Sequence, residues 1–476
     1  MKPSSRTIVE VVAATGFCLA LCLIAFREGR LLSFDGYYYV ELAKRFTTEW
    51  PDRFGNHWPF GWPLAGAALG RLGMSAYDAL RLLAVVGLVS IFWATANMLA
   101  HARVRFLCLF TLAAAPVLTH QVTSVMSELP FAAVLLGLAV TLSCTTSPLA
   151  WWLAALLTVT SLCIRYAGVI SFIVLLSWSC LAYKSLTSPR LKLHAMLACG
   201  SACFFGFLLL AINWFVSGSI SGAERGAADG ITYLPHHLSD FGWSISSALA
   251  ADGVRAIGMQ WTAAHTAIGV FLFCGLTALF LRSWFKPLSK WDRPLALIGI
   301  SYAVGIVVLR CVGDFDPLYN ARTFLPALAP TFILGCLRIQ SHPRILAGLL
   351  GVLLITGISN AIRGASRQIG GDVRPALSLL RDHLKANDII AINDHAFALT
   401  AYLSNRTKRV WAADWSKDTS VRFLVIAGEP QNRRGFPDAL PSTWQIACRS
   451  QIESGQFHSL INSSQLIVLE RVHSAR

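Results

Sequence analysis

Long apolar runs alternate with short polar stretches along most of the chain, up to about residue 361. Most of these runs approach the roughly 20 residues that an α-helix needs to cross a bilayer. The pattern predicts a mainly α-helical, polytopic membrane protein with about eleven transmembrane helices. The predicted spans lie near 8–26, 79–100, 106–119, 129–144, 150–164, 167–183, 195–216, 264–281, 294–310, 323–337 and 345–361. Several are short for a full crossing, which indicates broken or tilted helices.

The pattern changes in the tail of the chain, where apolar stretches of strand length appear between helical ones. Buried strands are predicted at 388–392, 422–428 and 466–469. Helical periodicity predicts a helix over 372–386 and another over 395–403. We therefore expect two domains, a transmembrane domain over residues 1–361 and a small soluble α/β domain over residues 362–476.

Composition supports the membrane class, because 55% of the residues are hydrophobic and only 14% are charged. A net charge of +15 can indicate nucleic-acid binding. The distribution of the basic residues argues against a nucleic-acid partner, because they gather in short loops between apolar runs, as the positive-inside rule expects for cytoplasmic loops. These basic residues are Lys2, Arg6, Arg103, Arg105, Lys184, Arg190, Lys192, Arg282, Lys286, Lys290, Arg293, Arg338 and Arg344.

The opposite set of loops is longer and carries the acidic residues; it comprises residues 27–78, 120–128, 217–263 and 311–322. With the N-terminus in the cytoplasm and eleven spans, these loops and the tail lie outside. We expect a multi-pass protein of the inner (cytoplasmic) membrane with a periplasmic, or more generally extracytoplasmic, C-terminal domain. The outer loops would then hold the functional site.

The first outer loop begins with Asp35, which is followed by three tyrosines. Helical spacing places Asp35, Tyr38 and Tyr39 on one face, with Lys44 and Arg45 about two turns further on. Such a segment is typical of a helix lying on the membrane surface. A purely structural explanation fits the same pattern: the tyrosines form part of an aromatic belt at the membrane surface, and the charges are solvated.

Three further outer-face positions carry candidate chemistry. His57 lies in a turn made rigid by prolines and a glycine, where it could contact substrate or only cap the turn. Glu128 begins a predicted span, and a helix N-terminus favours a carboxylate there whatever its function. Arg165, followed by Tyr166, lies between two spans; it could snorkel to the interface or hold a phosphate through its fork of N–H donors.

The last outer loop contains Asp314 and Asp316, then Tyr319 and Arg322. The two aspartates are candidates for a divalent cation, although a solvated loop explains them too. Tyr319 is a candidate for substrate contact, and Arg322 is a candidate for phosphate binding. The twelve cysteines show no metal-ligand spacing, and no other cofactor is indicated.

Carboxylates, arginines and tyrosines at one face of a membrane protein fit attack by a hydroxyl or amine on a sugar carried by a lipid phosphate. A carboxylate such as Asp35 accepts the proton of the nucleophile. The leaving group is already a phosphate, so it needs positive charge, which arginine supplies. Tyrosine rings can stack on the sugar.

At these residues the chain resembles the GT-C glycosyltransferases, especially the bacterial protein mannosyltransferase-like and aminoarabinose-transferase-like enzymes. The resemblance covers roughly residues 8–361. The matching segments are Asp35 with Tyr38 and Tyr39, Trp58 to Leu64, Ser127 to Phe131, Arg165 to Gly168, and Arg322 to Pro326.

The resemblance implies catalysis by Asp35, with Glu128 as a second acidic residue, and a polyprenyl-phosphate-linked sugar donor. The acceptor would be a lipid, a glycan or a protein, and membrane lipids would surround the site. Gly36 stands where many members have a second acid, so Asp35 has no acidic neighbour in its own loop. A transporter or flippase of lipid-linked saccharide, or a non-catalytic assembly subunit, would also need some of these residues. Few charged residues at mid-depth of the spans favour an enzyme over a transporter.

Overall fold

The computed structural model describes residues 5–25, 34–48, 59–100, 104–186, 188–217, 232, 234–250, 263–312, 325–366, 374–384, 389–392, 408–411, 421–427, 444–451 and 465–471. The chain divides into two compact units. One unit comprises residues 1–22, 51–62 and 81–361, and is called the membrane unit below. The other comprises residues 23–50, 63–80 and 362–476 and is called the tail unit. The predicted outer loop 27–78 is therefore divided between the two units.

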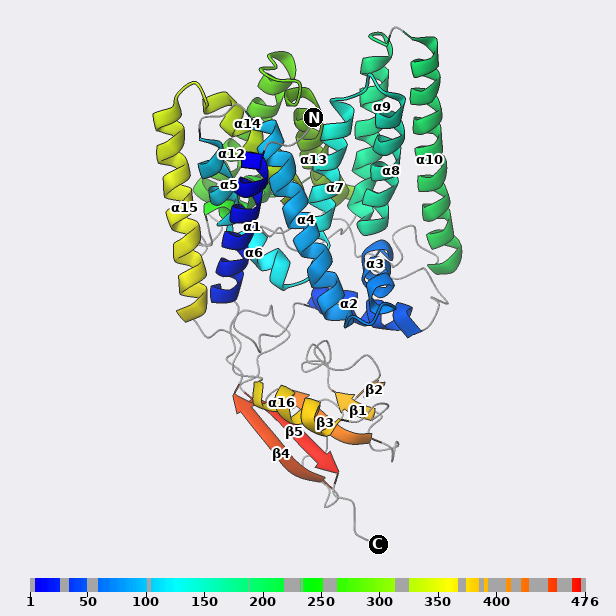
Figure 1. The fold of residues 1–476 in the computed structure, drawn as a ribbon, viewed down its shortest axis with the longest axis vertical. Coiled ribbons are helices and arrows are strands. Elements are labelled where there is room, and N and C mark those ends of the chain that lie inside the picture. Colours follow the sequence, from blue (N-terminus) through cyan, green and yellow to red (C-terminus); the bar gives the residue numbers. More distant parts are fainter. Residues whose placement is uncertain are drawn as a thin grey trace. The chain divides into compact units, whose positions relative to one another are not determined.

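The membrane unit is helical in all its described elements, as the apolar runs predict (Figure 1). Its helices are α1 (Ser5–Ala25), α4 (Ala76–Met98), α5 (Arg105–Ala113), α6 (Pro116–Thr123), α7 (Glu128–Leu142), α8 (Pro148–Ile164), the short 3-10 helix η1 (Tyr166–Gly168), α9 (Val169–Tyr183), α10 (Pro189–Ser217), α11 (Leu234–Ala250), α12 (Ala263–Phe285), α13 (Asp292–Val312), α14 (Leu325–Ile339) and α15 (Pro343–Ser366). The first residues of α4 and the last residues of α1 and α15 belong to the tail unit.

Seven of the described helices are long and apolar enough to cross a membrane, or eight if α5 and α6 together count as one bent span. Three more apolar helices, α7, α8 and α14, are shorter than a full crossing requires. All three coincide with predicted spans. The described residues thus support seven or eight of the eleven predicted spans, and the others remain predictions.

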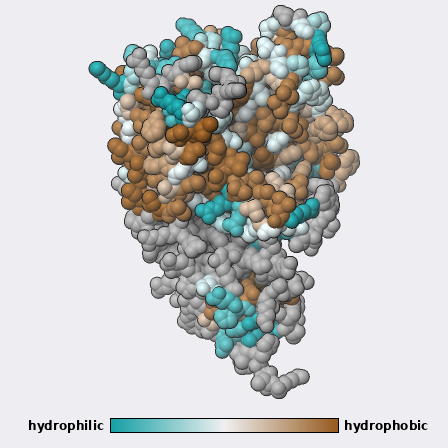
Figure 2. Space-filling model, in the orientation of Figure 1, coloured by the Kyte–Doolittle hydropathy of each residue, from teal (hydrophilic) through white to brown (hydrophobic). Residues whose placement is uncertain are grey.

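Helices that follow one another in the sequence pack side by side in this unit: α7 with α8, α11 with α12, α12 with α13, and α13 with α14. Helix α14 also packs against α7, which brings the two halves of the unit together. Large apolar side chains such as Phe207, Phe215, Val352 and Ile355 are exposed on α10 and α15. Figure 2 shows a broad hydrophobic surface over these helices. Lipid chains are the solvent that suits such a surface.

The bend between α5 and α6 measures 52°. Pro116 begins α6 and has no N–H to continue the hydrogen bonding of α5. Helix α15 packs directly on the bend, because a Cβ atom placed on Gly357 would lie 2.3 Å from the Ala114 carbonyl oxygen. Thr111 of α5 also donates from Oγ1 to the Leu350 carbonyl at 3.1 Å. The bend is thus held by neighbouring backbone.

Two buried ion pairs lie at the basic ends of the helices. Arg105 Nε donates to Glu10 Oε2 at 2.6 Å and joins the start of α5 to α1. Arg338 Nη2 donates to Asp292 Oδ2 at 2.9 Å and joins the end of α14 to the start of α13. The sequence pattern places both arginines among the basic residues of predicted cytoplasmic loops. In the structure each arginine instead neutralises a buried carboxylate from another helix. A buried carboxylate needs such a partner, because an unpaired charge away from water is costly.

The tail unit contains α2 (Phe34–Thr48) and most of α3 (Gly61–Gly70). Helix α2 matches the helix predicted after the first span, and it buries one apolar face that includes Tyr39, Ala43 and Phe46. Arg71 donates from Nη2 to the Phe46 carbonyl at 3.1 Å and so satisfies one of the last carbonyls of α2.

The remainder of the tail unit is a five-stranded mixed sheet in the order β2-β1-β3-β5-β4. The strands are β1 (Ile389–Ile392), β2 (Lys408–Trp411), β3 (Val421–Ala427), β4 (Trp444–Gln451) and β5 (Gln465–Arg471). β1 pairs parallel with β2 and β3, whereas β5 pairs antiparallel with β3 and β4. Helix α16 (Arg374–His383) packs against β4 and β5. Strands β1, β3 and β5 and helix α16 lie where the pattern predicts them, while β2 and β4 were not predicted. The predicted helix over 395–403 lies outside the described residues.

We expect that Arg105→Met destabilises the protein by about 3 kcal/mol or more, because it leaves Glu10 buried without its closest cation. The double variant Glu10→Gln with Arg105→Met should recover part of this loss, because the uncompensated charge is gone. Arg6→Met is the matched control: Arg6 contacts the other oxygen of Glu10 at 2.9 Å, but its side chain is 78% exposed. Its loss should cost at most about 1 kcal/mol. Thermal unfolding in detergent measures all three, and a double variant no more stable than Arg105→Met would contradict the expectation.

Candidate functional site

The turn between α6 and α7 carries backbone strain. Val125 has φ of 49° and is fully buried. A β-branched residue rarely adopts this left-handed conformation, which costs on the order of 1–3 kcal/mol and persists only where the surroundings hold it. The strain places Ser127 and Glu128 at the very start of α7, where the helix N-terminus favours a carboxylate.

Arg165 holds this turn from the end of α8. Its Nη1 atom donates to Glu128 Oε1 at 2.8 Å and to Ser127 Oγ at 3.0 Å. The side chain of Glu128 is 1% exposed, whereas that of Arg165 is 19% exposed. The structure thus brings together Glu128 and Arg165, which the sequence suggests independently. A single guanidinium nitrogen contacts both Ser127 and Glu128 at the start of α7.

The backbone at Arg165 is shaped for this contact. Arg165 is extended, with φ of −148° and ψ of 141°, so the chain leaves α8 and turns into η1. A Cβ atom at Gly168 would lie 2.4 Å from the backbone nitrogen of Leu162, so only glycine fits there. The hydroxyls of Ser161 and Ser171 lie 2.6 Å apart and join α8 to α9 below the turn. These contacts fix the direction in which Arg165 leaves the helix.

Trp62 supports the strained turn from the other side. Its indole Nε1 donates to the Val125 carbonyl at 3.0 Å, and the ring is buried. The preceding residue, Gly61, packs directly on the end of α8, because a Cβ atom there would lie 2.6 Å from the Cys163 carbonyl oxygen. The start of α3 is therefore seated against both the α6–α7 turn and the α8 terminus.

A small pocket is lined by residues on both sides of Arg165 in the sequence. Tyr166 lies in its wall, and the Tyr166 hydroxyl accepts a hydrogen bond from Asn213 Nδ2 at 3.1 Å. The pocket is otherwise mostly apolar. Its lining residues are Pro59, Phe60, Leu162, Cys163, Tyr166, Leu209, Leu210 and Asn213. With room for about one water molecule, the pocket is far smaller than the cavities that bind small molecules.

Other candidate residues lie on α2 in the tail unit. Tyr39 is buried in the packing of α2, Tyr38 is half-buried and Arg45 is exposed. Lys44 is half-buried by surface area, yet loss of solvation by burial lowers its pKa to about 8, against a smaller opposite effect of Glu41. A lysine that gives up its proton this readily is a reactive or functional candidate.

Asp35 belongs to α2, but its side chain lies outside the described part of the structure. Five further candidates lie outside the described residues with both backbone and side chain: His57, Asp314, Asp316, Tyr319 and Arg322. Their roles remain predictions. Among the residues that the structure describes, no three His, Cys, Asp or Glu side chains gather as a metal site would require.

Sequence reasoning missed the role of Val125 and of Asn213. No sequence signal marks a valine as strained. Asn213 carried a usable signal, because it is a buried amide in the otherwise apolar run of α10. A polar residue inside a membrane helix is a candidate functional residue by default.

No protein-family model and no curated protein matches this sequence. Solved structures match it in three dimensions. The oligosaccharyltransferase of Archaeoglobus fulgidus in complex with Zn and sulfate matches with a TM-score of 0.50 and 12% identity, over 88% of this chain and 68% of that chain. ArnT from Cupriavidus metallidurans bound to undecaprenyl phosphate matches with a TM-score of 0.47 and 14% identity, over 98% of both chains. The arabinofuranosyltransferase AftD from Mycobacteria matches with a TM-score of 0.43 and 16% identity, over 97% of this chain and 41% of that chain.

The two weaker similarities support no conclusion by themselves. The similarity to the oligosaccharyltransferase extends over most of this chain and establishes a shared fold. The chain therefore shares the fold of that oligosaccharyltransferase, and at the level of fold this agrees with the GT-C resemblance.

The lowered pKa of Lys44 predicts a pH dependence of stability. The folded state disfavours the charged amine of Lys44, so burying this charge lowers the free energy of unfolding. This loss of stability is fully present below about pH 8 and is relieved as the pH rises toward the ordinary pKa of 10.5. We expect Lys44→Met to raise the melting temperature near neutral pH and to have a smaller effect near pH 10. The neighbouring exposed Arg45 provides the control, because Arg45→Met removes the same charge without relieving burial. An equal change in both variants would contradict the expectation.

Proposed function

We propose that this protein is an integral membrane glycosyltransferase. It transfers a sugar from a polyprenyl-phosphate-linked donor to a lipid, glycan or protein acceptor on the outer, periplasmic face of the inner membrane. The observation that carries the proposal is the buried Glu128–Arg165 pair on a strained turn, within the GT-C fold. Arg165 precedes α9, whose other end leads into the basic segment 184–192, so this pair lies at the end of α9 away from the predicted cytoplasmic loops.

In the proposed reaction the acceptor oxygen or nitrogen attacks the anomeric carbon of the donor sugar. The bond from this carbon to the phosphate oxygen breaks, and polyprenyl phosphate leaves with the electron pair. Asp35 takes the proton of the nucleophile. An ordinary aspartate is ionised at neutral pH and can accept it. No acid is needed for the leaving group, because a phosphate is already a stable anion.

Arg165 contributes the positive charge that the departing phosphate requires. Glu128 acts as the second acidic residue by holding the plane of the Arg165 guanidinium, as the 2.8 Å contact favours. A bidentate-capable guanidinium is well suited to a phosphate. Arg322, Lys44 and Arg45 are further candidates for the phosphate, and the candidates for contact with the sugar or acceptor are Tyr38, Tyr39, His57, Tyr166 and Tyr319. Asp314 and Asp316 are the candidates for a divalent cation.

One observation favours a second candidate function. The 52° bend between α5 and α6 resembles the discontinuous helices at which transporters bind their substrates. A flippase of lipid-linked saccharide would move a labelled donor between the leaflets of a vesicle without any acceptor. We expect no such movement above that of empty vesicles, because Glu128 and Arg165 lie at helix ends rather than at mid-depth.

Glycan profiling by mass spectrometry of a strain lacking this protein should reveal the missing product, and the unchanged protein should restore it. We expect Asp35→Asn and Glu128→Gln each to reduce the restored product by about 10²-fold or more, because they remove the base and the support of the phosphate-binding arginine. Asp35→Asn should keep the melting temperature, whereas Glu128→Gln should still insert and fold but melt at a lower temperature, because it breaks a buried ion pair.

Asp78→Asn is the control, because Asp78 is an exposed carboxylate of the same predicted loop and accepts a hydrogen bond from the Ser75 hydroxyl three residues before it. It should restore the product fully. Near-normal product from Asp35→Asn in membranes would overturn the mechanism. A strain whose glycans are unchanged, together with donor movement in vesicles, would support transport instead.

The support of the strained turn can be tested apart from its charges. Trp62→Phe removes the indole N–H that the Val125 carbonyl accepts and keeps the ring. Trp151→Phe is the matched control, because Trp151 Nε1 donates to the Thr145 carbonyl at 3.1 Å at the start of α8, away from Arg165. Each variant should lose about 1–3 kcal/mol of stability, since each leaves a carbonyl unpaired. Only Trp62→Phe should lower product formation, by about tenfold or more, and equal activity of the two variants would contradict this role.

A further inference from the structure

The turn between α12 and α13 combines charge and apolar surface at the membrane boundary. It joins two candidate spans, Thr266–Phe285 and Asp292–Leu309. Its sequence from Leu281 to Arg293 contains several basic residues and a single acid, Asp292. A turn of this composition is strongly basic. It can act as a defined binding site only if hydrogen bonds hold its backbone in one conformation.

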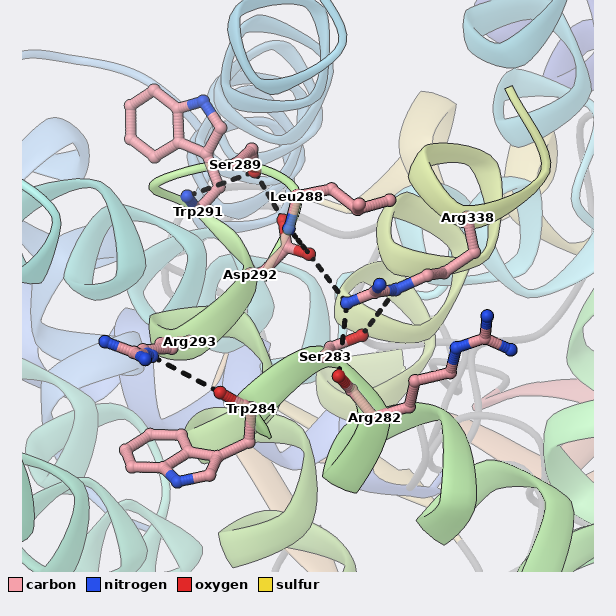
Figure 3. A network of polar contacts seen from close by, with 9 residues as sticks. All are labelled: Arg282, Ser283, Trp284, Leu288, Ser289, Trp291, Asp292, Arg293 and Arg338. Carbon is pink, nitrogen blue, oxygen red and sulfur yellow. Dashed lines mark hydrogen bonds and ion pairs between the residues drawn. The ribbon is translucent and has the colours of Figure 1, made fainter. Parts of the chain in front are cut away.

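Asp292 organises the turn from within. It is fully buried and accepts hydrogen bonds from the Leu288 backbone N–H at 3.0 Å and from the Ser289 hydroxyl. The Ser289 hydroxyl in turn accepts the Trp291 backbone N–H at 3.2 Å. Arg338 of α14 neutralises the carboxylate at 2.9 Å (Figure 3). The single negative charge of the turn is therefore used internally and is hidden from the surface.

Arg338 and Arg293 hold the two sides of the turn together. Arg338 also donates from Nε to Ser283 Oγ at 3.3 Å and from Nη2 to the Arg282 carbonyl at 3.4 Å. Arg293 donates from Nε to the Trp284 carbonyl at 3.3 Å. The end of α12, the turn and the start of α13 thus form one hydrogen-bonded frame, as the dashed lines in Figure 3 show.

Basic and apolar side chains of the turn that take no part in this hydrogen-bonded frame are exposed on its surface. Arg282, Lys286 and Lys290 are exposed. Phe285 and Leu288 between them are 72% and 59% exposed. Apolar side chains exposed at the end of a membrane span suit the acyl boundary, and basic side chains beside them suit the headgroup layer.

We propose that the α12–α13 turn is a binding site for the headgroup phosphate of an anionic phospholipid. The frame orders the backbone in advance, so binding a headgroup costs less ordering than it would on a flexible loop. Arg282, Lys286 and Lys290 contact the phosphate, while Phe285 and Leu288 enter the acyl boundary. The exposed apolar side chains identify the source of the phosphate as a lipid rather than a soluble anion. The site does not depend on the proposed glycosyl transfer.

Native mass spectrometry of the detergent-purified full chain, titrated with phosphatidylglycerol, tests the site. A variant with Arg282→Gln, Lys286→Gln and Lys290→Gln should bind the lipid on the order of 100-fold more weakly, because each basic residue near the surface contributes roughly fivefold. The control removes as many charges from another basic segment, through Lys184→Gln, Arg190→Gln and Lys192→Gln. It should weaken binding no more than about fivefold. Equal losses in the two variants would overturn the site and leave only general attraction by a basic face. Equal retention of inorganic phosphate in place of the lipid would overturn the assignment to lipid.

A second pair of variants separates the ordered frame from simple charge. Asp292→Asn makes the turn more positive, so simple attraction predicts tighter lipid binding. The proposed site predicts weaker binding, because the frame loses its centre. Ser289→Ala keeps every charge and removes the hydroxyl that links Asp292 to the Trp291 backbone, so it tests the same point if Asp292→Asn lowers the melting temperature strongly. Unchanged or tighter binding by a folded Ser289→Ala would contradict the ordered site.

Discussion

Pairing of buried carboxylates with arginines is the constraint on which the membrane unit depends. A charge removed from water costs several kcal/mol unless a partner and further hydrogen bonds compensate it. Each pair joins the terminus of one helix to a different helix, so it fixes the depth of the two helices relative to each other as well as their contact. Among the described residues these pairs are Glu10 with Arg105, Glu128 with Arg165, and Asp292 with Arg338.

The three pairs differ in how their surroundings are satisfied. Asp292 has backbone, hydroxyl and guanidinium donors, and its turn shows no strained backbone. The Glu128–Arg165 pair, by contrast, lies beside a strained turn, because Val125, three residues before Glu128, has a left-handed backbone conformation. The side chain of Gln121, one turn earlier, is fully buried, and neither of its polar atoms has a hydrogen-bond partner among the described residues. Proteins keep such costly features mainly at functional sites.

The sequence predicts the membrane helices well, because these depend on local hydropathy. It therefore identifies the helical membrane class, the helix after the first span, and Glu128 and Arg165 as candidates. Partners depend on contacts between distant segments, so the sequence places Arg105 and Arg338 in basic cytoplasmic loops without indicating that each contacts a buried carboxylate. The same limit hides Trp62, whose indole reaches a carbonyl 63 positions away in the sequence. The sequence does not reveal strands β2 and β4, because half of their residues are polar and neither forms a continuous apolar run. Pairing with neighbouring strands is what identifies them.

Helix α14 links the features of the two ends. Arg338 fixes one end of α14 to the α12–α13 frame, and Leu325 at its other end follows the candidate phosphate ligand Arg322 closely in the sequence. A helix of 15 residues rises only about 22 Å, less than the roughly 30 Å of the bilayer core. Its depth therefore cannot be set by hydrophobic length alone and is set by what anchors its ends. The Asp292–Arg338 pair supplies one anchor, so a lipid bound at the α12–α13 turn would stabilise the depth of α14.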